Sequence, residues 1–438
     1  MCLLPSLRIL VPIHTMPNAK NISTMFFESI LPELRKKSKV HVIWFVYQPE
    51  KQNLLIPQNS DTTISFIHDY KNAVEVLKNE KPDLIYSGAT WSFIDYALSL
   101  AAKFLNIPVC SMLWSDWYFD SSTNLINRIK LLLTRFFESS IPTDTVQNQK
   151  QFMRRGRFYI YKLLFMLKTQ RAINMSRSEI LKLLFVIIKQ ILTDAPNNSR
   201  FANTIHFLED EHLQNQLLKA GFKKSSLVVT GNPLFDSPFQ KLHSKIPSHK
   251  KNDDTIIHVL FAPTTLYEHG MWTKSQKDFA IKQIISKLAE NKKEMSVVVK
   301  IHPSSSLLSE YQPIINSVDS SISVYKNGDI QQFLDTADIM ISFQSATTEI
   351  YAMIAKKPIV ICNFFSSKTD KFVENGVAFE CKNPSDLVKI IHHAISNQSY
   401  EHNREKFIQE FMYKGDGRAA ERISNEIMNL LQKNHNTL

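Results

Sequence analysis

The stretch TADIMISFQSATTEIYAMIAKKPIVIC, residues 336–362, decides the fold of this chain. It begins with an apolar run of strand length, Asp338–Ser342, passes through a polar turn, and then repeats apolar residues at helical spacing from Thr348 to Ala355. A second apolar run, Ile359–Cys362, follows a Lys-Pro pair and predicts another strand. The succession strand, turn, helix, strand is the repeating unit of a parallel α/β sheet.

The polar turn of this stretch lies where its first strand ends, which is where open α/β sheets bind their ligands. The free N–H groups of the following helix favour an anion at that place. Ser345, Thr347 and Thr348 add hydroxyl donors, and Glu349 can accept two hydrogen bonds from a sugar diol. The alternative is that Ser and Thr cap the helix and that Glu349 favours its N-terminus electrostatically.

Length and composition indicate a globular protein of two domains. The chain has 438 residues, of which 44% are hydrophobic, 11% aromatic and 21% charged. Its four cysteines show no metal-ligand spacing, which favours reduced thiols in a cytosolic protein; no metal or cofactor is predicted. The N-terminal apolar run is too short for a signal peptide, and no run reaches the roughly 18 residues of a spanning helix.

The net charge of +11 is concentrated in one segment. Residues 128–192 contain thirteen Lys and Arg against three acidic residues, and the basic side chains are interleaved with bulky apolar ones. This mixture is typical of helices that lie in a membrane interface and attract anionic headgroups. Nucleic acid is not a predicted partner, because no reading module is recognisable. Plain packing remains the alternative for residues 178–192, a strongly apolar helix behind a capping serine.

The first part of the chain predicts a doubly wound parallel sheet. Between residues 8 and 113, strand-like runs alternate strictly with helical segments. Polar or aromatic side chains follow three of these strands, and loops at the carboxyl ends of parallel strands usually carry the chemistry. Asp116 and His14 are therefore the candidate general bases. The alternative for each is a turn or capping residue.

The second part repeats the alternation after a change in composition. Residues 237–255 are polar and rich in Lys, Ser, His and Pro, which predicts an interdomain linker. In the following domain, the strand at 295–301 ends on His302 and Pro303. A neutral or protonated His302 can donate a hydrogen bond to a phosphate oxygen. A hydrogen-bonded loop histidine is the alternative.

Six short motifs follow one another in the order found in a known superfamily. They are GNPLFD at 231–236, FAPT at 261–264, KIHP at 300–303, SFQSATTE at 342–349, KKP at 356–358 and KGDGRAAERI at 414–423. Together they resemble the two-domain GT-B superfamily, in particular its CDP-glycerol glycerophosphotransferases and UDP-N-acetylglucosamine 2-epimerases. The resemblance covers most of the chain apart from the segment at about 120–195.

In that superfamily the C-terminal domain binds the nucleotide diphosphate part of the donor. The resemblance implies that His302 contacts phosphate and that Glu349 holds the ribose. It also implies that Ser345, Ala346 and Thr347 present hydroxyl and backbone donors to the phosphate. The remaining residues that it assigns to the donor site are Pro303, Thr264, Thr265, Ser342, Thr348, Gly231 and Asn232.

The chain departs from both branches at several positions. Epimerases carry an Asp where this chain has Ala89, and a His and a Glu where it has Ser111 and Leu113. Because epimerisation needs acids and bases on both faces of the sugar, these losses count against that reaction. The polyol-phosphate branch usually has Trp-His-Gly where Trp114 is followed by Ser-Asp, and a glycine where Lys356 precedes Lys-Pro.

These observations predict an α/β protein with two Rossmann-like doubly wound domains of the GT-B type. The expected parts are an acceptor-side domain at 1–236 with a basic helical insertion at about 120–195, the linker at 237–255, a donor-binding domain at 256–415, and a helix at 416–438 that crosses back. The expected activity is transfer of a sugar or polyol phosphate from a CDP- or UDP-linked donor to a lipid-linked or polymer acceptor at the cytoplasmic membrane face. The alternatives are an epimerase-like isomerase and a non-catalytic sugar-nucleotide-binding protein that recruits partners to the membrane.

Overall fold

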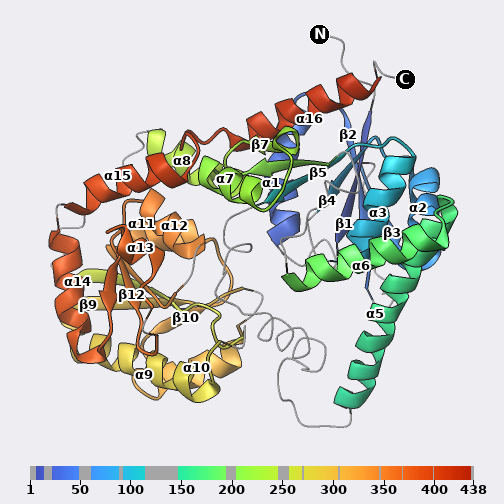
Figure 1. The fold of residues 1–438 in the computed structure, drawn as a ribbon. Helices are drawn as coiled ribbons and strands as arrows, with labels where there is room; N and C mark the ends of the chain where they lie inside the picture. The colour runs from blue at the N-terminus through green and yellow to red at the C-terminus, as the bar shows by residue number, and fades with distance from the viewer. Residues whose placement is uncertain are drawn as a thin grey trace. The chain divides into compact units, whose positions relative to one another are not determined.

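The computed structural model describes residues 6–13, 22–48, 61–87, 92–113, 147–193, 204–244, 256–268, 271–303, 306–344, 347–366, 368–397 and 399–435. The chain forms two compact units, Met1–Leu234 with Arg418–Leu438, and Phe235–Gly417 (Figure 1). Each unit is built on one parallel sheet. The predicted α/β class with two Rossmann-like sheets is confirmed.

The sheet of the first unit has seven strands within the described residues, in the order β3-β2-β1-β4-β5-β6-β7. They are β1 (Leu7–Ile13), β2 (Val40–Val46), β3 (Thr62–Phe66), β4 (Leu84–Ser87), β5 (Val109–Leu113), β6 (Thr204–Leu208) and β7 (Leu227–Val229). All neighbouring strands run parallel. The chain proceeds from β1 to β3 in one direction and from β4 to β7 in the other, so its switch point lies between β1 and β4.

Helices cover both faces of this sheet. One face packs against α2 (Ala73–Glu80), α3 (Phe93–Phe104) and α5 (Gln147–Ala172), and the other against α1 (Ile22–Arg35) and α16 (Ala419–His435). Successive strand residues alternate between these cores, as a pleated strand requires: Leu10 lies in the first, and Ile9 and Val11 in the second. A third cluster packs α7 (Glu211–Lys219) on the β5–β6–β7 end.

The sheet of the second unit has six strands within the described residues, in the order β10-β9-β8-β11-β12-β13. They are β8 (Ile257–Ala262), β9 (Met295–Lys300), β10 (Ser323–Tyr325), β11 (Ile339–Ser342), β12 (Ile359–Cys362) and β13 (Phe379–Cys381). All pairs are parallel. The direction of winding changes between β8 and β11, which places the switch point between the loops that follow these two strands.

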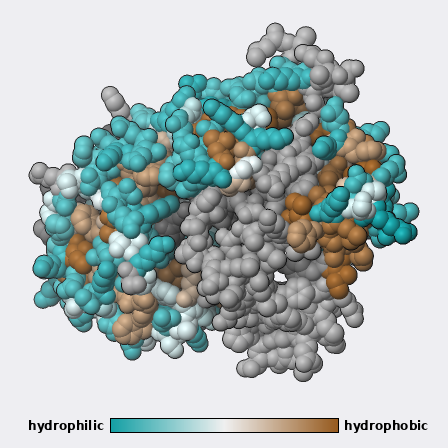
Figure 2. Space-filling view, viewed as in Figure 1, coloured by the Kyte–Doolittle hydropathy of each residue, from teal (hydrophilic) through white to brown (hydrophobic). Residues whose placement is uncertain are grey.

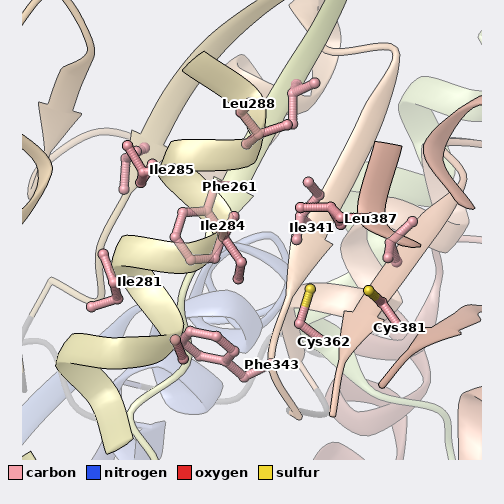
Figure 3. Close-up of a cluster of buried hydrophobic side chains, with 14 of the residues drawn as sticks. Phe261, Ile281, Ile284, Ile285, Leu288, Ile341, Phe343, Cys362, Cys381 and Leu387 are labelled. Atoms are coloured by element: carbon pink, nitrogen blue, oxygen red, sulfur yellow. The ribbon is translucent and has the colours of Figure 1, made fainter. Parts of the chain in front are cut away.

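One face of this second sheet packs against α9 (Lys274–Glu290), α10 (Leu308–Asn316) and α14 (Leu387–Ser396). Figure 3 shows how Ile281, Ile284 and Leu288 of α9 lie over Phe261 and Ile341 of the central strands. The remaining helices of the unit are α8 (Asp236–His243), α11 (Ile330–Thr336), α12 (Thr347–Ile354), α13 (Lys371–Glu374) and α15 (Ser399–Phe411). Within the stretch 336–362, β11, α12 and β12 form the predicted strand, helix and strand, and residues 345–346 of the predicted turn lie outside the described residues.

The surroundings of Lys356 explain why a lysine can replace the glycine that the family pattern has before Lys-Pro. Lys356 follows α12 with a left-handed backbone (φ 60), the conformation for which glycine is usually selected at a helix C-terminus. Its Nζ lies 2.8 Å from Glu401 Oε1, and Arg404 also donates to this carboxylate. The hydrogen bonds from Arg404, followed by those from Lys356, lower the pKa of Glu401 to about 2. A left-handed backbone is strained for any residue other than glycine, and the ion pair with Glu401 gives Lys356 a favourable interaction at this position.

The first unit ends at Leu234 and resumes at Arg418, each within two residues of the predicted domain limits, whereas the predicted linker differs more. The sequence predicted a linker at 237–255, but helix α8 occupies Asp236–His243 and belongs to the second unit. Phe239 is buried, and the Gln240 side chain donates a hydrogen bond to the Gly417 carbonyl at 2.6 Å. Gly417 has a φ of 68, and a Cβ there would lie 2.8 Å from the Asp236 carbonyl oxygen. The polar stretch therefore contains a helix, and the burial of Phe239 and the hydrogen bond to Gly417 contribute to its stability.

Helices α5 and α6 (Arg177–Thr193) connect β5 to β6, which are adjacent strands. Their inner sides are anchored, because Phe165 and Met166 are buried in the first core and Leu183 and Leu184 pack against it. Within the described ranges, no helix combines the length and apolar character needed to cross a bilayer.

A buried Ser–His pair joins two strands of the first unit. Ser111 on β5 and His206 on β6 are register partners, and the Ser111 Oγ and His206 Nδ1 atoms are 2.7 Å apart. The pair is 1% and 0% exposed, and the imidazole meets the edge of Phe222. Burial lowers the pKa of His206 to about 3, so the folded protein holds this ring neutral.

We expect the first unit to lose stability in acid because of His206. The unfolded chain takes up a proton on this ring below its ordinary pKa of 6.5, whereas the folded state does so only near 3. The contribution of neutral His206 to the free energy of unfolding is therefore complete above pH 6.5. It falls by about 1.4 kcal/mol per pH unit as the pH drops toward 3. Urea unfolding followed by tryptophan fluorescence between pH 7.5 and 5 measures this slope, and His206→Asn should flatten it. Equal slopes for both proteins would show that His206 is not the responsible group.

Candidate functional site

The carboxyl edge of the second sheet collects most of the predicted donor-binding residues. Strand β8 lies between β9 and β11, and Ala262, the last residue of β8, pairs with Ser342, the last of β11. The segments that follow these three strands carry Thr264 and Thr265, His302 and Pro303, and, in the first turn of α12, Thr347 to Glu349. Residues separated by up to 85 positions in sequence therefore share one edge of the sheet.

Ser342 and Glu349 form a buried pair beside the switch point. Both residues are 0% exposed, and the Ser342 hydroxyl donates a hydrogen bond to Glu349 Oε1. Helix α12 begins at Thr347, whose side chain is exposed, while Thr348 is half-buried. The first turn of α12 therefore offers backbone N–H groups and two hydroxyls above a carboxylate that the protein itself holds in place.

The loop after β9 is fixed by a lysine that sequence reasoning did not single out. Lys300 is 6% exposed, and its Nζ donates to the carbonyls of Ile301 and Lys326, each at 2.9 Å. Burial lowers the pKa of Lys300, and the Asp329 carboxylate partly offsets this effect. His302 and Pro303, directly after Ile301, are exposed. The lysine ties the end of β9 to the end of β10, and it thereby positions the loop that presents His302.

The loop after β8 contains a second cluster that the sequence did not reveal. Glu268 Oε1 accepts hydrogen bonds from Ser306 Oγ and Tyr311 Oη, both at 2.8 Å. Burial raises the pKa of Tyr311, so its hydroxyl remains a donor at all ordinary pH values. The partners lie 38 and 43 positions away in sequence, which is why a single polar loop gave no signal of their connection.

Two predicted donor-binding residues lie in the first unit instead. Gly231 and Asn232 follow β7, and Gly231 has a left-handed backbone with a φ of 86. The Asn232 side chain accepts from the Leu234 N–H at 3.0 Å and donates to Glu209 Oε2 at 3.3 Å. Its amide therefore closes a local turn within the first unit.

Four other predicted site residues, Asp116, His14, Ser345 and Ala346, lie outside the described residues. The described parts of the chain contain no group of three His, Cys, Asp or Glu side chains that could hold a metal ion. The free thiols described there, Cys110, Cys362 and Cys381, are buried core residues.

The chain resembles several solved structures across nearly its whole length. The S. aureus MnaA–UDP structure aligns with a TM-score of 0.54 and 16% identity over 97% of each chain. UDP-GlcNAc 2-epimerase from Neisseria meningitidis bound to UDP-GlcNAc aligns with a TM-score of 0.51 and 16% identity over 97% of this chain and 100% of that one. UDP-GlcNAc 2-epimerase from Methanocaldococcus jannaschii aligns with a TM-score of 0.53 and 16% identity over 97% of this chain and 99% of that one. At this identity the likeness establishes the fold, which is GT-B-like.

A search of curated proteins finds no match. A family match, in contrast, spans residues 199–429, more than half of the chain, and its family is described as CDP-Glycerol:Poly(glycerophosphate) glycerophosphotransferase. The matched range contains the whole second sheet and its carboxyl edge, with His302, Ser342 and Glu349. The chain therefore belongs to the CDP-glycerol:poly(glycerophosphate) glycerophosphotransferase family and is a transferase.

Proposed function

We propose that this transferase moves a polyol phosphate, or a sugar, from a CDP- or UDP-linked donor to a membrane- or polymer-linked acceptor in surface glycan biosynthesis. The observation that carries the proposal is the family match over the sheet whose carboxyl edge bears His302 and the Ser342–Glu349 pair. That edge offers an imidazole, a helix N-terminus and a carboxylate, which suit a phosphate and a ribose diol.

In the proposed donor complex, His302 and the first turn of α12 bind the diphosphate, and Glu349 accepts hydrogen bonds from the ribose hydroxyls. Thr264, Thr265, Pro303, Ser342 and Thr348 line the same edge. Ser345 and Ala346 extend the donor set at the start of α12. Such donors stabilise a developing negative charge best when they are held in place before the reaction, and the buried Lys300 and Ser342 supply that rigidity.

The proposed reaction is a substitution at phosphorus in the polyol-phosphate case. The acceptor hydroxyl oxygen forms a bond to the phosphorus that carries the polyol, and the bond from this phosphorus to the bridging oxygen breaks. CMP leaves with that oxygen, and the acceptor proton passes to a base of the first domain, Asp116 or His14. His302 donates to the departing phosphate. In sugar transfer the acceptor oxygen bonds to the anomeric carbon instead, and the nucleoside diphosphate leaves.

An epimerase activity is disfavoured by the residues at the sheet of the first unit. Ser111 occupies the position of a catalytic histidine in the epimerase pattern, and it is buried with its hydroxyl bonded to His206. Leu113, at the position of the glutamate, is part of the apolar cluster under α7. Neither side chain can exchange a proton with the carbon of a sugar. The fold shared with epimerases is therefore not accompanied by their acid–base residues.

Donor turnover in the presence of acceptor membranes tests the proposal. The protein is incubated with CDP-glycerol, CDP-ribitol or UDP-N-acetylglucosamine, with and without membranes, and released nucleotides are separated by chromatography. We expect release of CMP, or of UDP for a sugar donor, that depends on the acceptor. Conversion of UDP-N-acetylglucosamine to its C2 epimer, or no turnover of any donor, would overturn the proposal.

We also propose that α5 and α6 form a peripheral membrane-binding surface on an insertion of the first domain, at the cytoplasmic face. Ile160 and Leu164 of α5, and Leu181 and Phe185 of α6, are 47–71% exposed, and each pair is spaced by four residues on one helix face. Figure 2 shows apolar surface over this region. Residues 158–186 also contain five basic residues against one acidic residue, Glu179. Apolar side chains beside an excess of positive charge suit an anionic bilayer surface.

Removing the apolar side chains should release the protein from membranes. We expect the wild type to float with liposomes that contain about one third phosphatidylglycerol, and the double variant Leu181→Glu with Phe185→Glu to lose most of this binding, because it replaces apolar area with negative charge. Ile395→Glu is the matched control, since Ile395 is also exposed (40%) but lies on α14 of the second unit. Equal flotation of both variants would contradict the assignment of this surface.

A further inference from the structure

The two carboxylate oxygens of Glu268 differ in their hydrogen bonding. Oε1 accepts hydrogen bonds from the hydroxyls of Ser306 and Tyr311, which are 1% and 0% exposed. Oε2 is shielded from solvent and has no hydrogen-bond partner among the described residues. Thr264, four positions earlier in the same loop, likewise has a buried hydroxyl oxygen that lacks a partner there. Buried polar atoms usually have hydrogen-bond partners, so two buried atoms without one in a short loop indicate that a ligand supplies the partner.

The loop is fixed rather than free to satisfy these atoms by itself. Leu266, between the two residues, is 7% exposed, and its carbonyl accepts from the Met271 and Trp272 N–H groups at 2.8 and 3.1 Å. Tyr311 is held from the other side, because the Lys277 ammonium lies 4.9 Å from its ring centre. Both anchors preserve the position of the Glu268 carboxylate.

The loop follows β8, on one side of the switch point, while the Ser342–Glu349 pair follows β11 on the other. Two carboxylates thus flank the place where an α/β sheet binds its ligand. We propose that Glu268 and Thr264 form a hydroxyl-binding site for the group that is transferred, a polyol or a sugar. This inference rests on the proposed function and adds the residues that recognise the donor beyond its nucleotide.

The chemistry of the two atoms indicates this class of ligand. A carboxylate oxygen only accepts hydrogen bonds, and a threonine hydroxyl can both donate and accept, so the pair suits a neutral O–H group. An anion is unsuitable beside Glu268, and the phosphates have His302 and the start of α12. A polyol or sugar carries several hydroxyls within one small group, whereas the diphosphate carries none.

The two bonds to Oε1 make one substitution especially informative. In Glu268→Gln, the amide oxygen can take the place of Oε1 and keep both hydrogen bonds from Ser306 and Tyr311, which puts the NH₂ group in the place of Oε2. The variant has the same shape but presents a donor where the native protein presents an acceptor. Thr264→Val removes the second group, again without a change of shape. Glu310→Gln is the matched control, since Glu310 belongs to the same cluster but pairs with Lys277.

Calorimetric titration with CDP-glycerol and with CDP, and with UDP-N-acetylglucosamine and UDP, separates the transferred group from the nucleotide. For the pair that binds the wild type, we expect Glu268→Gln to weaken binding of the complete donor about ten- to hundredfold. We expect Thr264→Val to weaken it severalfold, and Glu310→Gln to leave it unchanged. Affinity for CDP or UDP should stay within about twofold in all three variants.

The possible results distinguish the two proposals. If the wild type binds the donor and both variants bind it equally well, or if they lose affinity for CDP or UDP to the same extent, this inference is overturned and the proposed function stands. If the wild type binds no nucleotide and no donor, the proposed function fails, and this inference fails with it.

Discussion

Replacing His302 with alanine should lower the rate of donor turnover by about 10²- to 10³-fold, the usual effect of removing one donor to a developing negative charge. The imidazole is exposed at the end of β9, in a loop that Lys300 ties to β10. The fold does not depend on an exposed ring, so the loss should appear in turnover and in affinity for nucleotide, while thermal stability stays close to that of the wild type. Release of CMP or UDP under saturating acceptor measures the rate.

His392→Ala provides the matched control for this substitution. His392 is also exposed (48%), and its Nε2 lies 3.6 Å from Glu294, the residue before β9. It therefore sits at the amino edge of the same sheet, away from the proposed site. Equal turnover by the two variants would show that His302 has no part in the reaction.

Replacing Glu349 with glutamine should weaken binding of CDP or UDP about ten- to hundredfold, the free energy of one or two hydrogen bonds to a charged acceptor. The carboxylate is 0% exposed, and Ser342 donates to its Oε1. Glutamine keeps the shape and can still accept from Ser342 through its carbonyl. Calorimetric titration of the nucleotide measures the change, and it does not depend on which group is transferred.

Two further measurements define the role of Glu349. Ser342→Ala should have a smaller effect on nucleotide affinity, because it removes a positioning hydroxyl and leaves the carboxylate in place. Glu310 is a carboxylate in the first turn of α10 that pairs with Lys277, so Glu310→Gln should leave nucleotide affinity unchanged. Unchanged affinity in Glu349→Gln would instead support a purely electrostatic role of this residue at the start of α12.

The fold could be predicted because each element is encoded locally. The apolar runs of β8, β9, β11 and β12 are buried strands, and polar or proline-containing turns separate them from the helices. The positions of strand ends in a parallel sheet follow from this alternation, so His302 and Glu349 could be assigned to one edge before any coordinates existed. The family motifs then supplied roles that no single residue could indicate.

The remaining features depend on contacts between distant parts of the chain. Helix α8 forms in a polar stretch because Phe239 is buried and Gln240 bonds to the Gly417 carbonyl, far along the sequence. Glu268 looks like an ordinary loop residue until Ser306 and Tyr311 converge on it. The helix at 178–192 was predicted to be either buried or at a membrane surface, and α6 has one side packed on the core and another side exposed. Leu184 packs on the core, whereas Phe185 is 71% exposed.

The central claim is that the carboxyl edge of the second sheet grips the diphosphate of a nucleotide-activated donor. A crystal structure of the protein with CDP-glycerol, or with UDP if that binds more tightly, tests it most directly. The account predicts electron density for the two phosphates between His302 and the first turn of α12, with the ribose hydroxyls at Glu349. Phosphates bound elsewhere, with His302 and Glu349 both out of contact with the nucleotide, would contradict it.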